Sequence, residues 1–256
     1  MQFAPMPELN PRSKQKGGLL VVKRKAWERF LSLLYPERCC CCGKPVVCGK
    51  VVCTHCRPRL KSILPPLCPY CGCAKKDCRC GGHRRHTDRC VSPFYHEGAA
   101  RSALHRLKFD GKAYVAEIFC LSMAKTIQRE YGEVVFDCIV PVPLSRAVSN
   151  KRKYNQSLVL AKGLAPLLKV DCRELLIKEY ETAPQRELPA YRRSGNVLGV
   201  FSVPPDKFIH KGCTILLVDD TITTGATMDE CAKILKIYGA KAVYAVTATA
   251  SRLSES

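Results

Sequence analysis

Apolar and polar positions follow two regular patterns in the second half of the chain. Short apolar runs, such as residues 213–218, indicate buried strands, and segments with an apolar residue every three or four positions indicate amphipathic helices. The predicted helices cover residues 100–111, 115–132, 155–168 and 225–239, and the predicted strands cover residues 136–143, 213–220 and 241–250. Because strands alternate with helices, we expect an α/β domain with a mostly parallel sheet covered on both faces.

The first part of the chain has a different pattern. Residues 1–22 are polar and rich in Pro and Lys, which favours disorder, and residues 27–34 are predicted to form a short helix. Residues 39–90 combine Cys, Gly, Pro and basic residues with few large apolar side chains, so this segment cannot bury enough surface to fold unaided. The sequence therefore predicts three parts, namely a tail with a short helix (1–38), a Cys-rich segment (39–90) and an α/β domain (91–256).

Cysteines are concentrated in the predicted Cys-rich segment. Of the 18 cysteines, 13 lie between Cys39 and Cys90. We find no secretory signal and no apolar run of the roughly 18 residues that a membrane span needs. We therefore expect a cytoplasmic protein, in which clustered cysteines bind metal more often than they form disulfides.

The first cysteine cluster contains two CxxC pairs separated by ten residues, followed in the first pair by Gly43, which suits a tight turn. Two such pairs can place four thiolates around one Zn²⁺ at about 2.3 Å per bond. The predicted ligands are Cys39, Cys42, Cys53 and Cys56. A shift of register would use one of the neighbouring cysteines, Cys40, Cys41 or Cys48.

The second cluster pairs a CxxC with a less regular CxC. Its predicted ligands are Cys68, Cys71, Cys78 and Cys80, with Cys73 and His83 near enough to substitute. Four-thiolate sites have no open coordination position, so we expect both sites to be structural rather than catalytic. Two Zn²⁺ ions bound in this way would lower the net charge from +20 to about +16.

Positive charge is also concentrated at the start of the chain. Residues 1–90 carry 19 Lys and Arg against 5 Asp and Glu, whereas residues 91–256 carry 23 against 17. This asymmetry favours a polyanionic partner, nucleic acid first, although a solvated basic surface would have the same composition. Few aromatic residues lie among these charges, which predicts weak stacking on bases.

The stretch "LLVDDTITTGAT" places Asp219 and Asp220 at the end of a predicted strand, directly before a loop and a helix. Ligands of open α/β sheets bind beyond the carboxyl ends of strands, and the free N–H groups of a helix start favour a phosphate. The phosphate would contact Thr221, Thr223, Thr224, Gly225, Ala226 and Thr227. The carboxylates would repel a phosphate but can accept hydrogen bonds from a vicinal diol, so the pattern predicts a ribose phosphate site. An ordinary aspartate turn with a helix cap is the alternative.

Two long polar segments precede this site in the sequence. The first follows the predicted strand at 136–143 and includes Arg146 and Arg152, with a solvated basic loop as the alternative interpretation. Asn155, which ends it, suits either an N-cap or a substrate contact. The second segment, residues 181–201, includes Arg186, and its length favours a mobile lid that excludes water.

The aspartate stretch resembles the ribose phosphate signature of type I phosphoribosyltransferases, which bind phosphoribosyl pyrophosphate (PRPP) with Mg²⁺. Over roughly residues 31–249 the chain resembles the ComF family, which joins a double zinc ribbon to such a domain. The resemblance rests on "LLYPERCCCCG", "CPYCG", "LHRLKFDGK", "VPVPLSRAVSNKRKYNQS", "TAPQRELPAYRRSGNVLGVF" and "LLVDDTITTGAT". The chain departs from the family at two places. Residues 152–156 read RKYNQ where the family usually has RGFNQ, and the second ribbon ends in CxC where the family usually has CxxC.

The resemblance implies a substitution at the anomeric carbon of PRPP with loss of pyrophosphate. Asp219 and Asp220 would hold the ribose hydroxyls, and Mg²⁺ would bridge them to the pyrophosphate. Arg146, Arg152 and Arg186 are candidate pyrophosphate contacts. The family is also labelled predicted amidophosphoribosyltransferase, but no Cys and His pair in the α/β domain suggests ammonia release from glutamine.

The resemblance further implies a role in natural competence, the uptake of single-stranded DNA. One alternative is a non-catalytic module that senses PRPP and binds single-stranded DNA, or a DNA-uptake helicase-like partner, through its basic zinc ribbons. Such DNA binding should weaken steeply with salt. A redox switch built on the cysteines is a third possibility.

Overall fold

We analysed a computed structural model that describes residues 37–47, 49–80, 86–109, 111–144, 154–178 and 200–252. The expected tail and short helix, Cys48, His83 and most of the expected lid lie outside the described residues. The candidate pyrophosphate contacts Arg146, Arg152 and Arg186 lie outside them as well.

The centre of the molecule is a parallel sheet of five strands. Its order is β1 (Arg89–Val91), β7 (Ala242–Ala250), β6 (Thr214–Ile222) and β3 (Cys138–Pro141), and β2 (Phe94–Tyr95) also pairs with β7. Every pairing in this sheet is parallel. The fold is therefore a mostly parallel α/β fold, as predicted.

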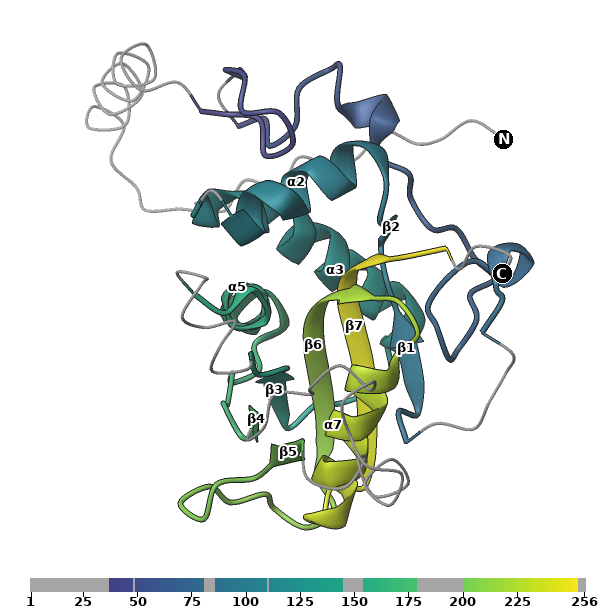
Figure 1. Cartoon of the computed structure of the whole chain (residues 1–256), viewed down its shortest axis with the longest axis vertical. Coiled ribbons are helices and arrows are strands. Elements are labelled where there is room, and N and C mark those ends of the chain that lie inside the picture. The colour runs from purple at the N-terminus through teal and green to yellow at the C-terminus, as the bar shows by residue number, and fades with distance from the viewer. Residues whose placement is uncertain are drawn as a thin grey trace, which may run out of the picture.

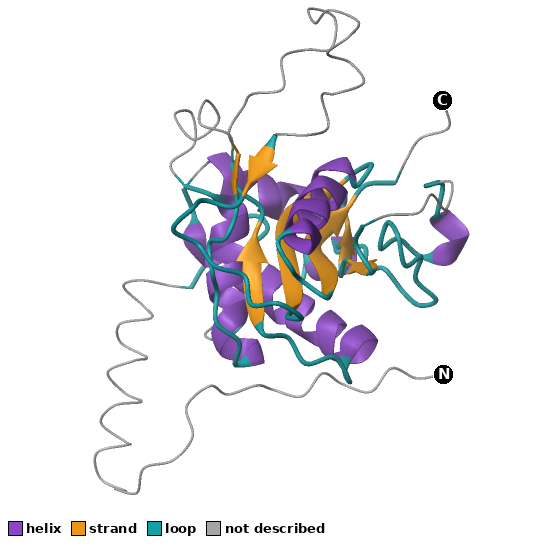
Figure 2. Ribbon diagram, turned by 90° about the horizontal axis from the view of Figure 1, so that it is seen from below, coloured by secondary structure: helices purple, strands orange, loops and turns teal. Residues whose placement is uncertain are grey.

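Four α-helices surround the sheet in the described residues. They are α2 (Gly98–Phe109), α3 (Ala116–Tyr131), α5 (Gln156–Leu168) and α7 (Ala226–Ile237), each within a few residues of its predicted range. Helices lie on both faces of the sheet, with α7 in front of β6 and β7 and α3 behind them (Figures 1 and 2). Helix α2 crosses over the carboxyl ends of these strands (Figure 1).

Shorter elements connect this framework. They are the 3₁₀ turns η1 (Arg57–Arg59), η2 (Lys75–Asp77) and η3 (Ala113–Val115), and the antiparallel pair β4 (Ile177–Lys178) and β5 (Phe201–Ser202). The sequence pattern missed β1, β2, β4 and β5, because two or three residues are too short to display a period of two.

Helix α7 packs as its recurring apolar positions predict, except at Tyr238. Met228, Cys231 and Leu235 of α7 are buried against the sheet, as their spacing predicts. Tyr238, which continues the same spacing, is half-exposed, because α7 ends at Ile237 and Tyr238 is its C-cap residue. None of the helices in the described part of the chain combines the length and apolar character that a membrane crossing requires.

Strand β6 extends further than predicted. It continues for two residues beyond the aspartates, because Thr221 and Ile222 pair with Thr249 and Ala250 of the long strand β7. Asp219 and Asp220 therefore lie inside a nine-residue strand rather than at its end.

The two Cys-rich turns have the same backbone geometry. Gly43 and Gly72 each follow a CxxC pair with positive φ, 76° and 70°. Each glycine N–H donates to the carbonyl of the first cysteine of its pair, at 2.8 Å for Cys39 and 3.0 Å for Cys68. An L side chain is strained in this conformation, which explains the glycine at both positions.

The Cys-rich segment packs directly on the α/β domain. Its buried residues form one continuous apolar cluster with the core of the sheet domain. The backbone N–H of Cys90 donates to the Pro69 carbonyl at 2.7 Å, and that of Tyr95 donates to the Lys61 carbonyl at 2.9 Å, so β1 and β2 each contact the Cys-rich segment. The Cys-rich segment therefore buries its apolar side chains against the α/β domain.

Candidate functional site

The aspartates lie where β6 loses one neighbouring strand. Pairing between β3 and β6 ends at Pro141 and Val218, whereas pairing between β6 and β7 continues from Asp219 to Ile222. From Asp219 onward, one edge of β6 is therefore not paired with β3, at the carboxyl end of the sheet. This is the part of an open parallel sheet where ligands bind.

Asp219 is held by the start of α5. The Ser157 hydroxyl donates to Oδ1 of Asp219 at 2.7 Å, and the backbone N–H of Asp220 donates to the same oxygen at 2.8 Å. Burial and the neighbouring charge of Asp220 raise the pKa of Asp219 to about 7, against the effect of these two hydrogen bonds. Asp219 is therefore poised to exchange a proton near neutral pH.

Asp220 forms an ion pair with α2. Its Oδ1 lies 2.7 Å from Nζ of Lys108, and the two side chains are only 12% and 18% exposed. Lys108 belongs to the last turn of α2, which crosses over this edge of the sheet (Figure 1). The two neighbouring carboxylates thus have different partners, a hydroxyl for Asp219 and an ammonium for Asp220.

A chain of polar side chains continues from the aspartates to β7 and β2. The hydroxyls of Thr221 and Thr249 lie 3.2 Å apart, and Nδ1 of His96 lies 3.0 Å from the Thr249 hydroxyl. Burial, together with the charges of Lys108 and Arg101, lowers the pKa of His96. His96 is therefore predominantly neutral at pH 7 and can accept or donate a hydrogen bond here.

The loop after β6 presents its polar groups outward. Thr223, Thr224, Ala226 and Thr227 are exposed, while Gly225 is buried and adopts φ 80° at the N-cap position of α7. The Thr224 hydroxyl accepts from the backbone N–H of Ala226 at 3.4 Å. Exposed hydroxyls and free N–H groups at a helix start form a suitable contact surface for a phosphate.

Asn155 is an N-cap. Its side-chain oxygen accepts from the backbone N–H groups of Ser157 and Leu158 at 3.0 and 3.4 Å, and its Nδ2 donates to the Val142 carbonyl at 3.1 Å. Of the two roles considered for Asn155, the structure displays the cap, which also orients Ser157 toward Asp219.

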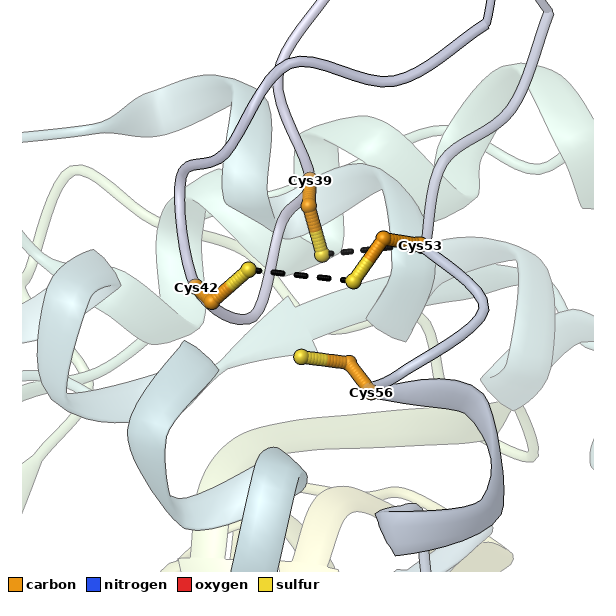
Figure 3. Close-up of side chains that lie close together, drawn as sticks. All are labelled: Cys39, Cys42, Cys53 and Cys56. Carbon is orange, nitrogen blue, oxygen red and sulfur yellow. Dashed lines mark hydrogen bonds between the residues drawn. The ribbon is translucent and has the colours of Figure 1, made fainter.

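The first cysteine group converges on one point (Figure 3). The sulfurs of Cys39, Cys42, Cys53 and Cys56 all lie within 4.8 Å of one another. Sγ of Cys42 lies 3.8 Å from Sγ of Cys53, and the backbone N–H of Cys53 donates to Sγ of Cys39 at 3.3 Å. Burial alone would raise the pKa of Cys39, but backbone donors including Cys53 and Cys42 lower it to about 6, which favours the thiolate.

The second group has the same form. The sulfurs of Cys68, Cys71, Cys78 and Cys80 also lie within 4.8 Å of one another. Sγ of Cys68 lies 3.7 Å from Sγ of Cys80, and Sγ of Cys71 lies 3.7 Å from Sγ of Cys78. The CxC spacing of Cys78 and Cys80 therefore does not prevent convergence.

Both groups have dimensions that fit a tetrahedral metal ion. Bonds of about 2.3 Å to Zn²⁺ separate neighbouring sulfurs by about 3.8 Å, close to the distances found between the cysteine pairs. Two groups of four cysteines can therefore each hold one metal ion, and they are the groups that the sequence predicted.

Two spare cysteines have other contacts. The Cys40 thiol donates to the Tyr114 carbonyl at 3.6 Å, and the Cys73 thiol donates to the Ser251 carbonyl at 3.7 Å. Burial raises the pKa of Cys40 to about 12, which keeps it a thiol. These two cysteines pack against the α/β domain rather than joining a metal group.

Sequence reasoning missed three of the polar groups around the aspartates. Lys108, Ser157 and His96 come from separate segments, and the sequence places none of them near β6. The available signals were weak, since Ser157 directly follows Asn155-Gln156 and Lys108 lies near the end of an amphipathic helix.

Two cavities lie away from the aspartates. One, of about 380 Å³, lies beside Cys40 and Tyr114, and the other, of about 610 Å³, lies between α3 and α5.

The chain matches the family described as "Phosphoribosyl transferase domain" over residues 155–255. Together with the parallel sheet, this match identifies the fold as that of a type I phosphoribosyltransferase.

Three relatives extend the similarity into the Cys-rich part. "Competence protein F" of Haemophilus influenzae is 27% identical over 213 residues, covering 79% of this chain and 92% of the relative. "Competence protein ComFC" of Bacillus subtilis is 27% identical, covering 72% and 77%. "DNA utilization protein YhgH" of Escherichia coli K12 is 29% identical, covering 82% and 96%. All three relatives are competence or DNA utilization proteins, so the expected resemblance to the ComF family is confirmed as a similarity.

The solved structures that resemble part of this chain include a PRPP amidotransferase and an adenine phosphoribosyltransferase. The B. subtilis glutamine PRPP amidotransferase complexed with ADP and GMP has a TM-score of 0.36 and 19% identity, covering 52% of this chain and 26% of that chain. The Saccharomyces cerevisiae adenine phosphoribosyltransferase has a TM-score of 0.38 and 16% identity, covering 56% and 72%.

Proposed function

We propose that the protein binds PRPP at the carboxyl end of β6 and acts as a phosphoribosyltransferase in natural competence or DNA uptake. The observation that carries this proposal is the position of two aspartates beside a helix start with two exposed threonines, at an edge of β6 that is not paired with β3. A carboxylate can accept both hydroxyls of a ribose diol, and the helix start can donate to its 5-phosphate.

Each group has a role in this proposal. Asp220 and Asp219 accept the ribose hydroxyls, and Thr223, Thr224 and Thr227 donate to the 5-phosphate together with backbone N–H groups of the loop. Thr221, Gly225 and Ala226 complete this contact surface. Mg²⁺ bound together with PRPP would spread the negative charge of the departing pyrophosphate, for which carboxylate oxygens are suitable neighbours. The reaction is substitution at the anomeric carbon, in which the bond to pyrophosphate breaks as the bond to the acceptor forms.

The remaining assignments are also proposals. Arg146, Arg152 and Arg186 would contact the pyrophosphate, and residues 181–201 would close over it. The two cysteine groups would hold Zn²⁺ as structural ions, and the division at residues 38 and 90 would separate tail, zinc ribbons and phosphoribosyltransferase domain. A cytoplasmic location would supply PRPP to this site.

The DNA-related role is supported by the names of the relatives, which are competence and DNA utilization proteins. The excess of positive charge in residues 1–90 is compatible with a phosphate backbone as partner. A second candidate function follows from the same charge, namely a non-catalytic PRPP sensor that binds single-stranded DNA or a helicase-like partner through its zinc ribbons.

Calorimetric titration with PRPP and Mg²⁺ tests the binding site. We expect Thr227→Val and Asp220→Asn to weaken binding by about 10- to 100-fold, since each removes a hydrogen bond to a charged or polar group of the ligand. Asp206→Asn is the matched control, because Asp206 is an exposed aspartate away from the site, paired only loosely with Lys207 at 3.5 Å. Unchanged affinity in both site variants would refute the proposal.

Pyrophosphate release separates the enzyme from the sensor. Incubation of the wild type with PRPP, Mg²⁺ and a panel of nucleobases should release pyrophosphate with at least one acceptor if the protein is a transferase. Tight binding of PRPP without release, combined with salt-dependent binding of single-stranded DNA, would support the sensor instead.

A further inference from the structure

Lys108 is placed where it can respond to the ligand of the proposed site. Its ammonium lies 2.7 Å from Oδ1 of Asp220, and both side chains are largely shielded from water. A shielded ion pair is rarely more stabilising than an apolar pair of similar volume, because both ions lose their hydration. Stability therefore does not by itself account for a lysine at this position.

The end of α2 is anchored to the segment that leads into α5. The Tyr154 hydroxyl donates to the Leu107 carbonyl at 2.5 Å, and Tyr154 directly precedes the Asn155 cap of α5. Asn155 in turn donates to Val142, which follows β3. The Lys108 backbone is thus attached to the β3 side of the site, while its side chain reaches across to Asp220 on β6.

Binding of a ribose diol would weaken the ion pair between Asp220 and Lys108. An oxygen that accepts a hydrogen bond from a sugar hydroxyl must share or give up its contact with the ammonium of Lys108. A largely buried ammonium that loses its carboxylate needs another anion nearby, because an unpaired buried charge is costly. In PRPP the diphosphate is attached to the carbon adjacent to the diol, so it supplies that anion.

We propose that Lys108 exchanges Asp220 for the diphosphate when PRPP binds, and that this makes the site selective for a pentose carrying a 1-diphosphate over ribose 5-phosphate. Lys108 would thereby be a ligand-binding residue from α2. The inference rests on the proposed PRPP site, and it identifies the charge pattern that the site requires in its ligand. Arg106, the other basic residue in the last turn of α2, donates to the Tyr114 hydroxyl at 2.7 Å and is directed to the Cys-rich side.

The test compares two ligands in one lysine variant. In Lys108→Met, we expect calorimetric affinity for PRPP with Mg²⁺ to fall by about 10- to 100-fold, the value of a hydrogen bond between charged groups. Affinity for ribose 5-phosphate should stay the same or increase, because the Lys108 ammonium no longer competes with the sugar hydroxyls for Asp220. Lys108→Arg should retain part of the preference for PRPP. Lys236→Met is the matched control, since Lys236 lies in the last turn of α7 and pairs with Asp88 at 2.9 Å.

Several outcomes are distinguishable. Equal loss of both ligands in Lys108→Met would overturn the inference, since it would mean that Lys108 only holds Asp220 in place. Unchanged affinity for both ligands would overturn it as well. If Lys108→Met unfolds, the double variant Lys108→Met/Asp220→Asn keeps the pair neutral, and it should show a ratio of PRPP to ribose 5-phosphate affinity below that of Asp220→Asn alone. A wild type that binds neither ligand would refute the PRPP proposal itself, whereas a wild type that binds both without selectivity would refute only the role of Lys108.

Discussion

The Ser157 hydroxyl donates a 2.7 Å hydrogen bond to Asp219, which joins the first turn of α5 to the central strand β6. This contact keeps one aspartate of the pair oriented while the other faces Lys108. The result is a pair of adjacent carboxylates whose environments differ, as is common where one fold separates the roles of two acidic groups.

Asp219 should make stability depend on pH. Because burial and Asp220 raise its pKa from 3.8 to about 7, the folded protein retains a proton that the unfolded chain releases between these values. The stability that this retained proton gives the folded protein is therefore complete at low pH, and it is lost as the pH rises through 7. The stability of Asp219→Asn relative to the wild type should increase as the pH rises from about 4 to 7, and above pH 7 it should reach a plateau on the order of 4 kcal/mol, or roughly 10 °C in Tm.

Thermal unfolding at several pH values measures this difference. Asn retains a side-chain oxygen for the Ser157 and Asp220 donors, so the variant preserves the local hydrogen bonds. Asp206→Asn serves as the control and should follow the wild type at every pH. A difference between Asp219→Asn and the wild type that does not change with pH would contradict the assigned pKa shift.

Metal content should fall by one ion per chain when either cysteine group is broken. Cys56→Ser removes one of four converging sulfurs, and elemental analysis should then find about one Zn²⁺ per chain instead of two. Cys172→Ser lies outside both groups and should retain two. Treatment of the wild type with a chelator should lower its Tm, and a Tm that does not change would argue against a structural role for the metal.

Gly43 should be more sensitive to substitution than Gly49. Both have positive φ, 76° and 80°, so alanine meets similar backbone strain at each position. A Cβ at Gly43 would also force the guanidinium of Arg106 to move away from the Tyr114 hydroxyl, to which it donates at 2.7 Å, whereas a Cβ at Gly49 meets nothing within 4 Å. We expect Gly43→Ala to lower the Tm further than Gly49→Ala and to weaken metal retention at the first group. Equal effects would show that contact with α2 is unimportant.

The second cysteine group should depend on Tyr95. The Tyr95 hydroxyl donates to Asp77 at 2.5 Å and accepts from the Ala74 N–H at 3.3 Å, and the guanidinium of Arg252 lies 4.1 Å from the centre of its ring. Asp77 directly precedes Cys78, a member of the second cysteine group. Tyr95→Phe should therefore cost about 1–2 kcal/mol and accelerate chelator-induced loss of one of the two ions.

Competition with a colorimetric zinc chelator measures these release rates. Tyr238→Phe is the control, since Tyr238 is half-exposed at the end of α7. If Tyr95→Phe releases both ions at wild-type rates, the contact between β2 and the second Cys-rich turn does not stabilise the metal group.

Local features of the molecule were readable from the sequence. The CxxC spacing with Gly43 and Gly72 predicted the cysteine groups, because a metal knuckle involves only neighbouring residues and one turn with positive φ. The long helices and strands β3, β6 and β7 were also predicted, because each displays its own period over enough residues. Strands β1 and β2 were not, since such short segments become strands only when β7 offers them a partner.

The sequence by itself determined the chemical identity of the candidate site, namely two adjacent carboxylates, a Thr-Thr-Gly helix start and two sets of thiols. Only the tertiary structure decided which partners these groups have. Ser157 donates to Asp219 and Lys108 pairs with Asp220, and the pairing of β3 with β6 ends just before the two aspartates. The physical reason is that periodicity and spacing act between near neighbours in the chain, whereas the partner of a buried charge is selected by packing between distant segments.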